Sequence, residues 1–84
     1  MTLRVAVAGA GYFAQFHLEA WKRIEQQGLV KLVAVADPDP ARLKQALEKH
    51  GIAKGFADAG VMLREIDVDL FDIATPPEIG RAHV

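Results

Sequence analysis

The spacing of apolar residues alternates along the chain between the period of a strand and the period of a helix. Apolar residues alternate with polar or small ones over residues 3–8, which predicts a first strand. From residue 13 the apolar positions follow one face of a helix, which we expect to end at Gly28. The apolar stripe of this helix comprises Phe13, Phe16, His17, Ala20, Trp21 and Ile24. The chain thus begins with a strand that leads into a helix.

The same alternation continues through the rest of the chain. Residues 29–36 form an almost uninterrupted apolar run, typical of an interior parallel strand. Asp39 and Pro40 then predict the N-cap and first position of a second helix, which Gly51 ends. The remaining segments are a weak third strand over 52–57, a short helix over 59–65, a fourth strand over 69–74 and the first turns of a helix over 78–84.

This order of elements predicts the fold class. Crossovers between consecutive parallel strands are right-handed, so a βαβαβαβ order favours a parallel sheet with helices on both faces. We therefore expect a doubly wound α/β fold of the Rossmann type, with strand order 3-2-1-4. The strand order then reverses beside the turn that follows the first strand, where such sheets open a ligand-binding crevice.

The length of the chain indicates that this sheet is incomplete on its C-terminal side. The chain has 84 residues, a length at which a domain buries only about 60% of its unfolded surface, which is marginal for an open parallel sheet. Residues 78–84 read as helical turns without a glycine stop. We therefore interpret residues 1–84 as the N-terminal part of a Rossmann domain. Its exposed sheet edge is completed either by further chain or by a partner.

Composition narrows the functional classes. The net charge of −1 and the lack of a basic patch argue against nucleic-acid binding. Cysteine, serine and asparagine are absent, which excludes disulfides, thiolate catalysis and a serine nucleophile. The histidines and carboxylates lack ligand spacing, so we predict no metal site. The early apolar run is broken by glycines, unlike a signal peptide, and no stretch is long enough to span a membrane. We predict a cytoplasmic protein.

The turn after the first strand carries the first candidate site. Gly9 permits a tight turn, Gly11 leaves room for a phosphate to approach the backbone, and Ala14 lets helix and strand pack closely. The first turn of the helix has no carboxylate to repel an anion at its positive end. Taken alone, these residues are compatible both with nucleotide binding and with an ordinary strand-to-helix turn.

A second candidate, Asp37, stands at the carboxyl end of the second strand. There its carboxylate is placed to accept hydrogen bonds from the hydroxyls of an adenosine ribose and to repel a 2′-phosphate. The alternative is that Asp37 only opens a turn before Pro38. Together with the glycines we favour ribose binding, and hence NAD. Arg42 leaves NADP open, although we expect its side chain to be solvated.

The end of the fourth strand and two polar residues complete the survey. Thr75, Pro76 and Pro77 form either a rigid loop that borders the crevice or a simple strand stop. His17 lies on the apolar stripe, which favours a packed, hydrogen-bonded histidine over a catalytic one. Asp72 interrupts an apolar strand and needs a hydrogen-bond partner, so we do not assign it to the site.

Three segments in this order resemble one protein family. LRVAVAGAGYFAQFH at the start, VAVADPDPARL around Asp37 and DLFDIATPPEI before the end of the chain are similar to the N-terminal domain of the Gfo/Idh/MocA oxidoreductases. The resemblance covers essentially the whole chain. It implies an NAD(P)-dependent enzyme that moves hydride between nicotinamide and a hydroxyl-bearing carbon of a sugar, cyclitol or similar small molecule.

The resemblance also implies roles for single residues. The pyrophosphate would lie against Gly9, Gly11, Tyr12, Phe13 and Ala14, the ribose against Asp37, and the wall near the cofactor would be Thr75, Pro76 and Pro77. Family members usually have a histidine three residues after the second proline, where this chain has Gly80. The family's catalytic lysine and its substrate domain would lie beyond Val84, so we assign no catalytic residue within the chain.

Other functions remain open at this point. A noncatalytic nucleotide-sensing or interaction module, completed by dimerisation through the open sheet edge, fits the same residues. A methyltransferase-like sheet that binds S-adenosylmethionine at the glycine turn fits less well, because a Thr-Pro-Pro loop follows the fourth strand. For the oxidoreductase we expect a homo-oligomer that binds neither nucleic acid nor membrane.

Overall fold

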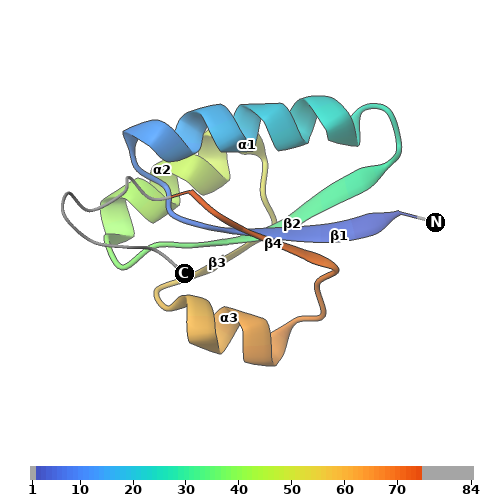
Figure 1. Ribbon diagram of the computed structural model, residues 1–84. Coiled ribbons are helices and arrows are strands. Elements are labelled where there is room, and N and C mark those ends of the chain that lie inside the picture. The colour runs from blue at the N-terminus through green and yellow to red at the C-terminus, as the bar shows by residue number, and fades with distance from the viewer. Residues whose placement is uncertain (1, 75–84) are drawn as a thin grey trace, which may run out of the picture.

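The computed structural model describes residues 2–74, which form seven elements (Figure 1). The predicted order is confirmed, and the ends of most elements fall within a few residues of the predicted ones. The predicted helix over 78–84 lies outside the described residues. The elements are β1 (Leu3–Ala8), α1 (Tyr12–Glu25), β2 (Val30–Ala36), α2 (Pro40–His50), β3 (Lys54–Phe56), α3 (Ala59–Glu65) and β4 (Leu70–Ile73).

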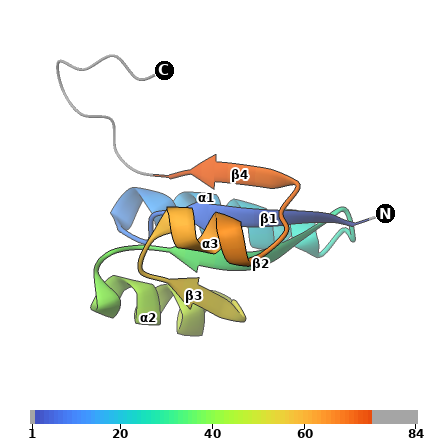
Figure 2. The ribbon, with the colours of Figure 1, turned by 90° about the horizontal axis from the view of Figure 1, so that it is seen from below.

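The four strands form one parallel sheet in the order β3-β2-β1-β4, as predicted. Figure 2 shows the strands side by side in this order, with α3 on the near side of the sheet. The register between β1 and β2 shifts once, because Val5 pairs with Leu32 whereas Ala6 pairs with Ala34. Val33 is therefore a bulged residue, a detail that the apolar run of β2 did not predict.

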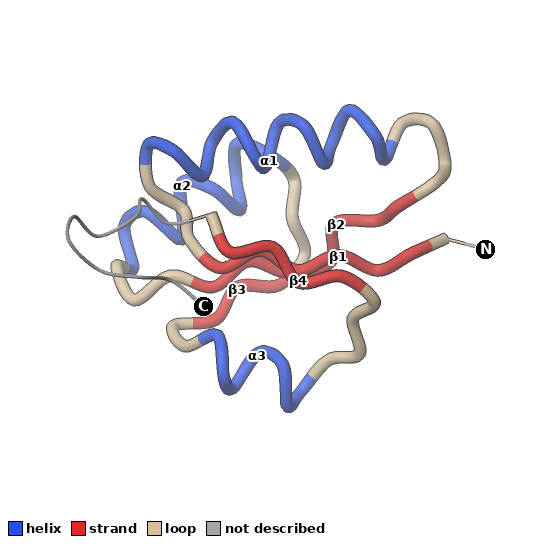
Figure 3. The backbone as a smooth tube through the Cα atoms, viewed as in Figure 1, coloured by secondary structure: helices blue, strands red, loops and turns tan. Residues whose placement is uncertain are grey.

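Helices cover both faces of the sheet, which makes the fold doubly wound (Figures 1 and 3). The helices α1 and α2 lie on one face, where Val5 and Val7 of β1 point, and α3 lies on the other, against Ala6. The larger side chains of β1 thus point to the face covered by two helices, and its small Ala6 points to the face covered by one helix. Among the described residues, no helix is long and apolar enough to cross a membrane.

The face that α1 presents to the sheet differs from the predicted stripe. Ala14 and Leu18 are fully buried in the core, whereas Phe16 is 58% exposed and Ala20 is also exposed. Part of the predicted stripe, including Phe16 and Ala20, therefore borders the edge strand β4, while Trp21 and Ile24 are partly buried against the core. Ala14 and Leu18 share a core cluster with Val5 and Val7 of β1, so the side of α1 that meets the sheet includes these two residues.

The helix ends follow the predicted local signals. Asp39 caps α2 by accepting hydrogen bonds from the backbone N–H groups of Ala41 and Arg42, at 2.9 and 3.3 Å. Gly51 ends α2 with a φ of 64°, a left-handed conformation that glycine adopts without strain. The third strand is only three residues long, consistent with its weak pattern.

Candidate functional site

The glycine turn joins β1 to α1 at the carboxyl edge of the sheet, beside the point where the strand order reverses. Gly9 continues the sheet by donating its N–H to the carbonyl oxygen of Ala36, at 2.7 Å. Its φ of 115° lies in the region that favours glycine, so a side chain at this position would strain the turn. The conformation of the turn therefore requires a glycine at position 9, as predicted from the sequence.

Asp37 connects this turn to the end of β2. Its side chain is buried, with 6% exposure, and Oδ2 accepts a hydrogen bond of 2.8 Å from the N–H of Ala10. Oδ1 accepts a hydrogen bond of 2.8 Å from the N–H of Asp39. The turn-forming alternative for Asp37 is therefore present in the structure. Because each carboxylate oxygen has a further acceptor position, ribose binding by Asp37 stays compatible with this geometry and stays a prediction.

Two residues that the sequence did not single out complete the turn. The side-chain amide of Gln15 donates hydrogen bonds to the carbonyl oxygens of Ala10 and Gly11, at 3.0 and 3.3 Å. Its Oε1 lies 2.8 Å from Nε2 of His50. Because the amide nitrogen of Gln15 donates to both carbonyls, its oxygen is the acceptor, and His50 donates through Nε2. A contact between the first turn of one helix and the last turn of the next has no local sequence signal.

The surroundings of His50 favour its neutral form. Burial lowers the pKa of its imidazole below the usual 6.5, and the positive charges of Lys49 and Lys22 lower it further, while Glu19 opposes them. A neutral imidazole with its proton on Nε2 donates to Gln15.

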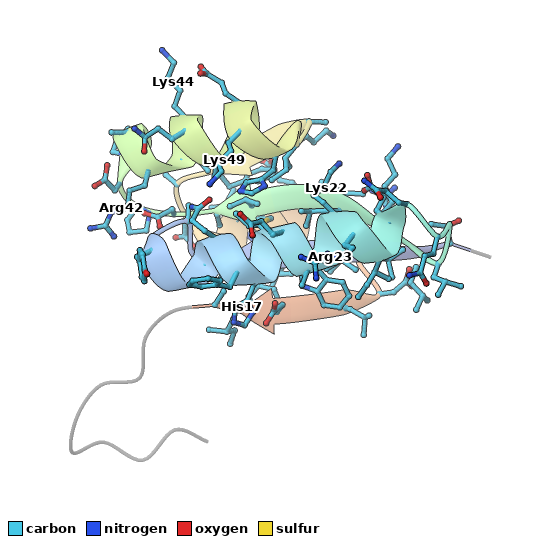
Figure 4. The ribbon with its side chains drawn as sticks, turned by 90° about the horizontal axis from the view of Figure 1, so that it is seen from above. His17, Lys22, Arg23, Arg42, Lys44 and Lys49 are labelled. Atoms are coloured by element: carbon cyan, nitrogen blue, oxygen red, sulfur yellow. The ribbon has the colours of Figure 1, made fainter. Side chains whose placement is uncertain are left out.

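Arg42 lies beside the glycine turn, at the end of the molecule where α1 begins (Figure 4). Its Nη1 is 3.4 Å from the position that a β-carbon on Gly11 would occupy, and its Nε is 3.4 Å from Oδ2 of Asp39. The side chain is largely exposed, as expected. The guanidinium of Arg42 therefore lies next to the predicted pyrophosphate site at Gly11.

The start of α1 differs from the starts of the other helices. Asp39 and Asp58 cap α2 and α3 through their side chains, whereas the N-cap of α1 is Gly11, which has no side chain to accept hydrogen bonds. The first turn of α1 contains no acidic residue. The positive end of this helix is therefore open to an anion.

The remaining predicted site residues fall in two groups. Tyr12 is largely exposed and packs edge-to-face on Phe16 at 5.6 Å, the backbone of Phe13 lies in α1, and Ala14 is fully buried. Thr75, Pro76 and Pro77 lie outside the described residues, so the wall that they were predicted to form stays a prediction.

Asp72 has the hydrogen-bond partners that its place in the strand required. Its Oδ2 lies 2.7 Å from Nδ1 of His17 and accepts a hydrogen bond of 2.8 Å from Nε1 of Trp21. His17 is hydrogen-bonded as predicted, but its packing is only partial, because its side chain is 44% exposed. Figure 4 shows His17 on the side of α1 next to β4.

A groove of about 480 Å³ lies between the apolar stripe of α1 and the edge strand β4. It is lined by Phe16, His17, Ala20, Trp21, Ile24, Leu70, Phe71 and Asp72.

Within residues 2–74, no group of three or more histidine or acidic side chains is arranged to hold a metal ion.

The chain is similar to curated dehydrogenases. It is 35% identical over 82 residues to a D-apiose dehydrogenase of Rhizobium rhizogenes, with 98% of this chain and 23% of the relative aligned. It is 42% identical over 76 residues to an inositol 2-dehydrogenase of an Arthrobacter species, with 89% of this chain and 22% of the relative aligned. The chain therefore spans less than a quarter of the length of these relatives.

Solved structures with the same fold include cofactor complexes. An oxidoreductase from Agrobacterium radiobacter in complex with NAD⁺, L-tartaric acid and magnesium is 33% identical, with a TM-score of 0.81 over 90% of this chain and 21% of that one. The scyllo-inositol dehydrogenase of Lactobacillus casei with bound NAD(H) and scyllo-inositol is 26% identical, with a TM-score of 0.79 over 90% of this chain and 22% of that one.

A family model covers almost the whole chain. The model, described as an oxidoreductase family with an NAD-binding Rossmann fold, matches residues 3–84. This match confirms the predicted fold and cofactor class, and it favours an oxidoreductase over a methyltransferase-like protein. The glycine turn, Asp37 and the parallel sheet around them belong to the NAD-binding Rossmann domain of the Gfo/Idh/MocA oxidoreductases, and the chain is a member of that family.

Proposed function

We propose that residues 1–84 form the N-terminal part of the NAD-binding domain of a dehydrogenase. In this proposal the glycine turn and the start of α1 hold the pyrophosphate, and Asp37 holds the adenosine ribose. The hydrogen bond from Ala10 N–H to Asp37 Oδ2 carries the proposal, because it joins the two predicted subsites into one unit at the carboxyl edge of the sheet. Figure 3 places the loops of this unit side by side at one end of the strands.

The residues present fit the chemistry of a dinucleotide. The pyrophosphate is an anion, and the start of α1 offers backbone N–H groups, no acidic neighbour in the first turn and the guanidinium of Arg42 nearby. The buried carboxylate of Asp37 supplies acceptors for ribose hydroxyls. When bound, the nicotinamide ring supplies or accepts the hydride. The chain's own residues bind and orient the rest of the cofactor.

The substrate class follows from the relatives. Curated relatives are named as apiose and inositol dehydrogenases, so the proposed reaction is hydride transfer between nicotinamide and a hydroxyl-bearing carbon of a sugar or cyclitol. This reaction needs a base for the hydroxyl proton and a pocket that holds the carbon. We assign neither to the 84 residues, which would bind cofactor without turning over substrate. We also propose a cytoplasmic homo-oligomer for the protein that carries this domain.

We propose NAD rather than NADP as the cofactor, because a 2′-phosphate would bring its negative charge to the carboxylate of Asp37. The backbone N–H groups of Ala10 and Asp39 donate to that carboxylate and hold its position at the end of β2. Arg42 is the residue that would offset the repulsion, and Asp39 is its partner at 3.4 Å.

The first prediction concerns this choice of cofactor. Substituting Asp37→Asn removes the charge and leaves the shape, so the ratio of the NADP dissociation constant to the NAD dissociation constant should fall about tenfold, a change of about 1.4 kcal/mol. Isothermal titration with both dinucleotides measures this ratio. The ratio is measured because Asp37 also holds the glycine turn in place. A disturbed turn would weaken the binding of both cofactors equally and leave the ratio unchanged.

Arg42→Gln is the matched variant for the same titrations. It should raise the ratio, because it removes the cation nearest the site and leaves Asp37 in place. An unchanged ratio in Asp37→Asn would refute the ribose assignment, even if both cofactors bound more weakly.

A further inference from the structure

We propose that Gln15 and His50 are positioning residues for the cofactor, a pair that orients the peptide group between Ala10 and Gly11 so that the N–H of Gly11, and not the carbonyl of Ala10, faces the pyrophosphate. The inference rests on the proposed function, since it concerns how the same turn binds its ligand. It adds two residues, one from each of two helices, to a site otherwise formed by a loop and a strand end.

The peptide groups on both sides of Ala10 are held by side chains. The N–H of Ala10 donates to Asp37 Oδ2 at 2.8 Å, and its carbonyl oxygen accepts from Gln15 Nε2 at 3.0 Å. The same Gln15 amide reaches the carbonyl of Gly11 at 3.3 Å. Two consecutive carbonyls at the start of α1 are therefore held toward Gln15.

The direction of these carbonyls matters for an anion. A carbonyl oxygen is the negative end of the peptide dipole, so a carbonyl directed at a phosphate weakens the attraction that the adjacent N–H groups provide. Glycine residues permit the turn to adopt several conformations, and the hydrogen bonds from Gln15 select one of them. Preorganisation of this kind lowers the cost of ordering the turn when the ligand binds.

His50 in turn fixes the orientation of Gln15. The side-chain amide of a glutamine can turn over and exchange its oxygen and nitrogen, and the wrong orientation would present oxygen to oxygen at Ala10. His50 Nε2 lies 2.8 Å from Gln15 Oε1. With its proton on Nε2, His50 favours the orientation in which the amide nitrogen of Gln15 faces the turn. His50 is itself buried at the end of α2, where packing holds its ring in place.

The test compares variants of both residues in the full-length protein. Gln15→Met keeps a side chain of similar length and removes the donors. His50→Leu removes the donor to Gln15, whereas His50→Gln keeps a nitrogen donor at a similar reach. Gln26→Met, at the opposite end of α1, is the matched control. Each variant is titrated with NAD⁺ and, by nuclear magnetic resonance, with adenosine, which has no phosphate. Thermal unfolding is recorded for each.

We expect Gln15→Met to weaken NAD⁺ binding about fivefold to tenfold, the equivalent of losing one or two hydrogen bonds, with adenosine binding unchanged. His50→Leu should weaken NAD⁺ binding in the same direction, His50→Gln should restore it, and Gln26→Met should bind as the wild type does. The contrast between the two His50 variants tests the inference even if Gln15→Met fails to fold.

Other outcomes separate this inference from the proposed function. If the wild type binds NAD⁺ and the Gln15 and His50 variants bind it equally well, the positioning role is wrong and the cofactor assignment stands. Equal weakening of NAD⁺ and adenosine would show a general structural role and overturn the inference. A wild type that binds no NAD⁺ would refute the proposed function itself, and the positioning role with it.

Discussion

At the scale of single residues, Asp37 performs a structural task and leaves acceptor capacity for a second one. Its two oxygens hold the glycine turn and the start of its own turn, each through one backbone N–H. A carboxylate accepts hydrogen bonds from ribose hydroxyls, whereas it repels the negative charge of a phosphate. Asp37 thus holds the glycine turn of the proposed pyrophosphate subsite and is also the proposed ligand of the ribose.

His50 makes stability depend on pH in a direction that can be worked out. Its pKa in the folded state is below the usual 6.5, first because of burial and then because of Lys49 and Lys22. Well above pH 6.5 the residue is neutral in both states, so it adds no pH dependence. As pH falls through that value, the unfolded chain takes up the proton more readily than the folded chain, and the free energy of unfolding decreases.

The His50→Gln variant should lack this part of the acid sensitivity. Urea unfolding at pH 7.5 and pH 5.5 should show a larger loss of stability for the wild type than for the variant. Both pH values lie above the region where Glu25 titrates. Burial raises the pKa of Glu25, but hydrogen bonds from Lys22 and Leu32 outweigh this effect together with the charges of Lys22 and Lys31. The pKa of Glu25 is therefore below its ordinary value of 4.5. An identical pH dependence in the two proteins would contradict the prediction.

At the scale of elements, the helix starts divide into two kinds with different tasks. The side chain of Asp39 caps α2 and also lies beside Arg42, whereas α1 starts without a side-chain cap. The capped helices are stabilised locally, and the uncapped one is open where the proposed ligand binds. Helix starts with Asp-Pro or Asp-x-Gly are visible in sequence because capping involves neighbouring residues only.

Asp39→Ala tests the contribution of this cap. Loss of the side-chain acceptor for two backbone N–H groups should reduce the free energy of unfolding by about 1 kcal/mol. Asp67→Ala is the control, because Asp67 is exposed and, among residues 2–74, contributes only its backbone carbonyl, to Arg4. The control should change stability by less than about 0.5 kcal/mol. Chemical denaturation of the two variants measures both values, and equal losses would contradict the capping role.

At the scale of the whole molecule, the two edges of the sheet have different characters. The edge strand β3 has three residues and includes Lys54 and Gly55, features that discourage pairing with another chain. The other edge strand, β4, has apolar side chains that are partly exposed, with Ile73 at 63%. Within residues 2–74 only β1 pairs with β4, which leaves the outer edge of β4 available to a further strand.

We expect the 84 residues prepared alone to self-associate through β4. Ile73→Lys should shift the association to at least about tenfold higher concentration, because a charge on an edge strand opposes pairing. Leu63→Lys on α3, which replaces another exposed apolar residue, is the control and should leave association unchanged. Sedimentation velocity over a range of concentrations measures the effect. Equal behaviour of both variants would place the association elsewhere on the surface.

The same edge bears on the second function considered for this chain. A sensing or interaction module completed by dimerisation would need β4 as its interface, and its exposed apolar side chains are the observation in favour. If the unmodified chain stayed monomeric at high concentration, the exposed side chains of β4 would no longer support this function. The cofactor assignment does not depend on this outcome, because the glycine turn lies at the carboxyl edge of the sheet.

The sequence by itself determined the elements, their order, the helix stops and the strand order 3-2-1-4. Each of these depends on neighbouring residues or on the general handedness of crossovers, so a linear pattern contains them. It also pointed to Gly9, Gly11 and Asp37, whose residue types carry their own conformational and chemical signals.

Only the tertiary structure decided which face of α1 meets the sheet and which side chains complete the turn. Of the predicted apolar stripe, Phe16 is exposed whereas Trp21 and Ile24 pack against the core, and the fully buried Ala14 and Leu18 lie outside that stripe. The hydrogen bonds of Gln15 with His50, and of Asp72 with His17 and Trp21, join residues far apart in the chain. Such contacts follow from how the layers pack, and a pattern of residue types along the chain does not contain them.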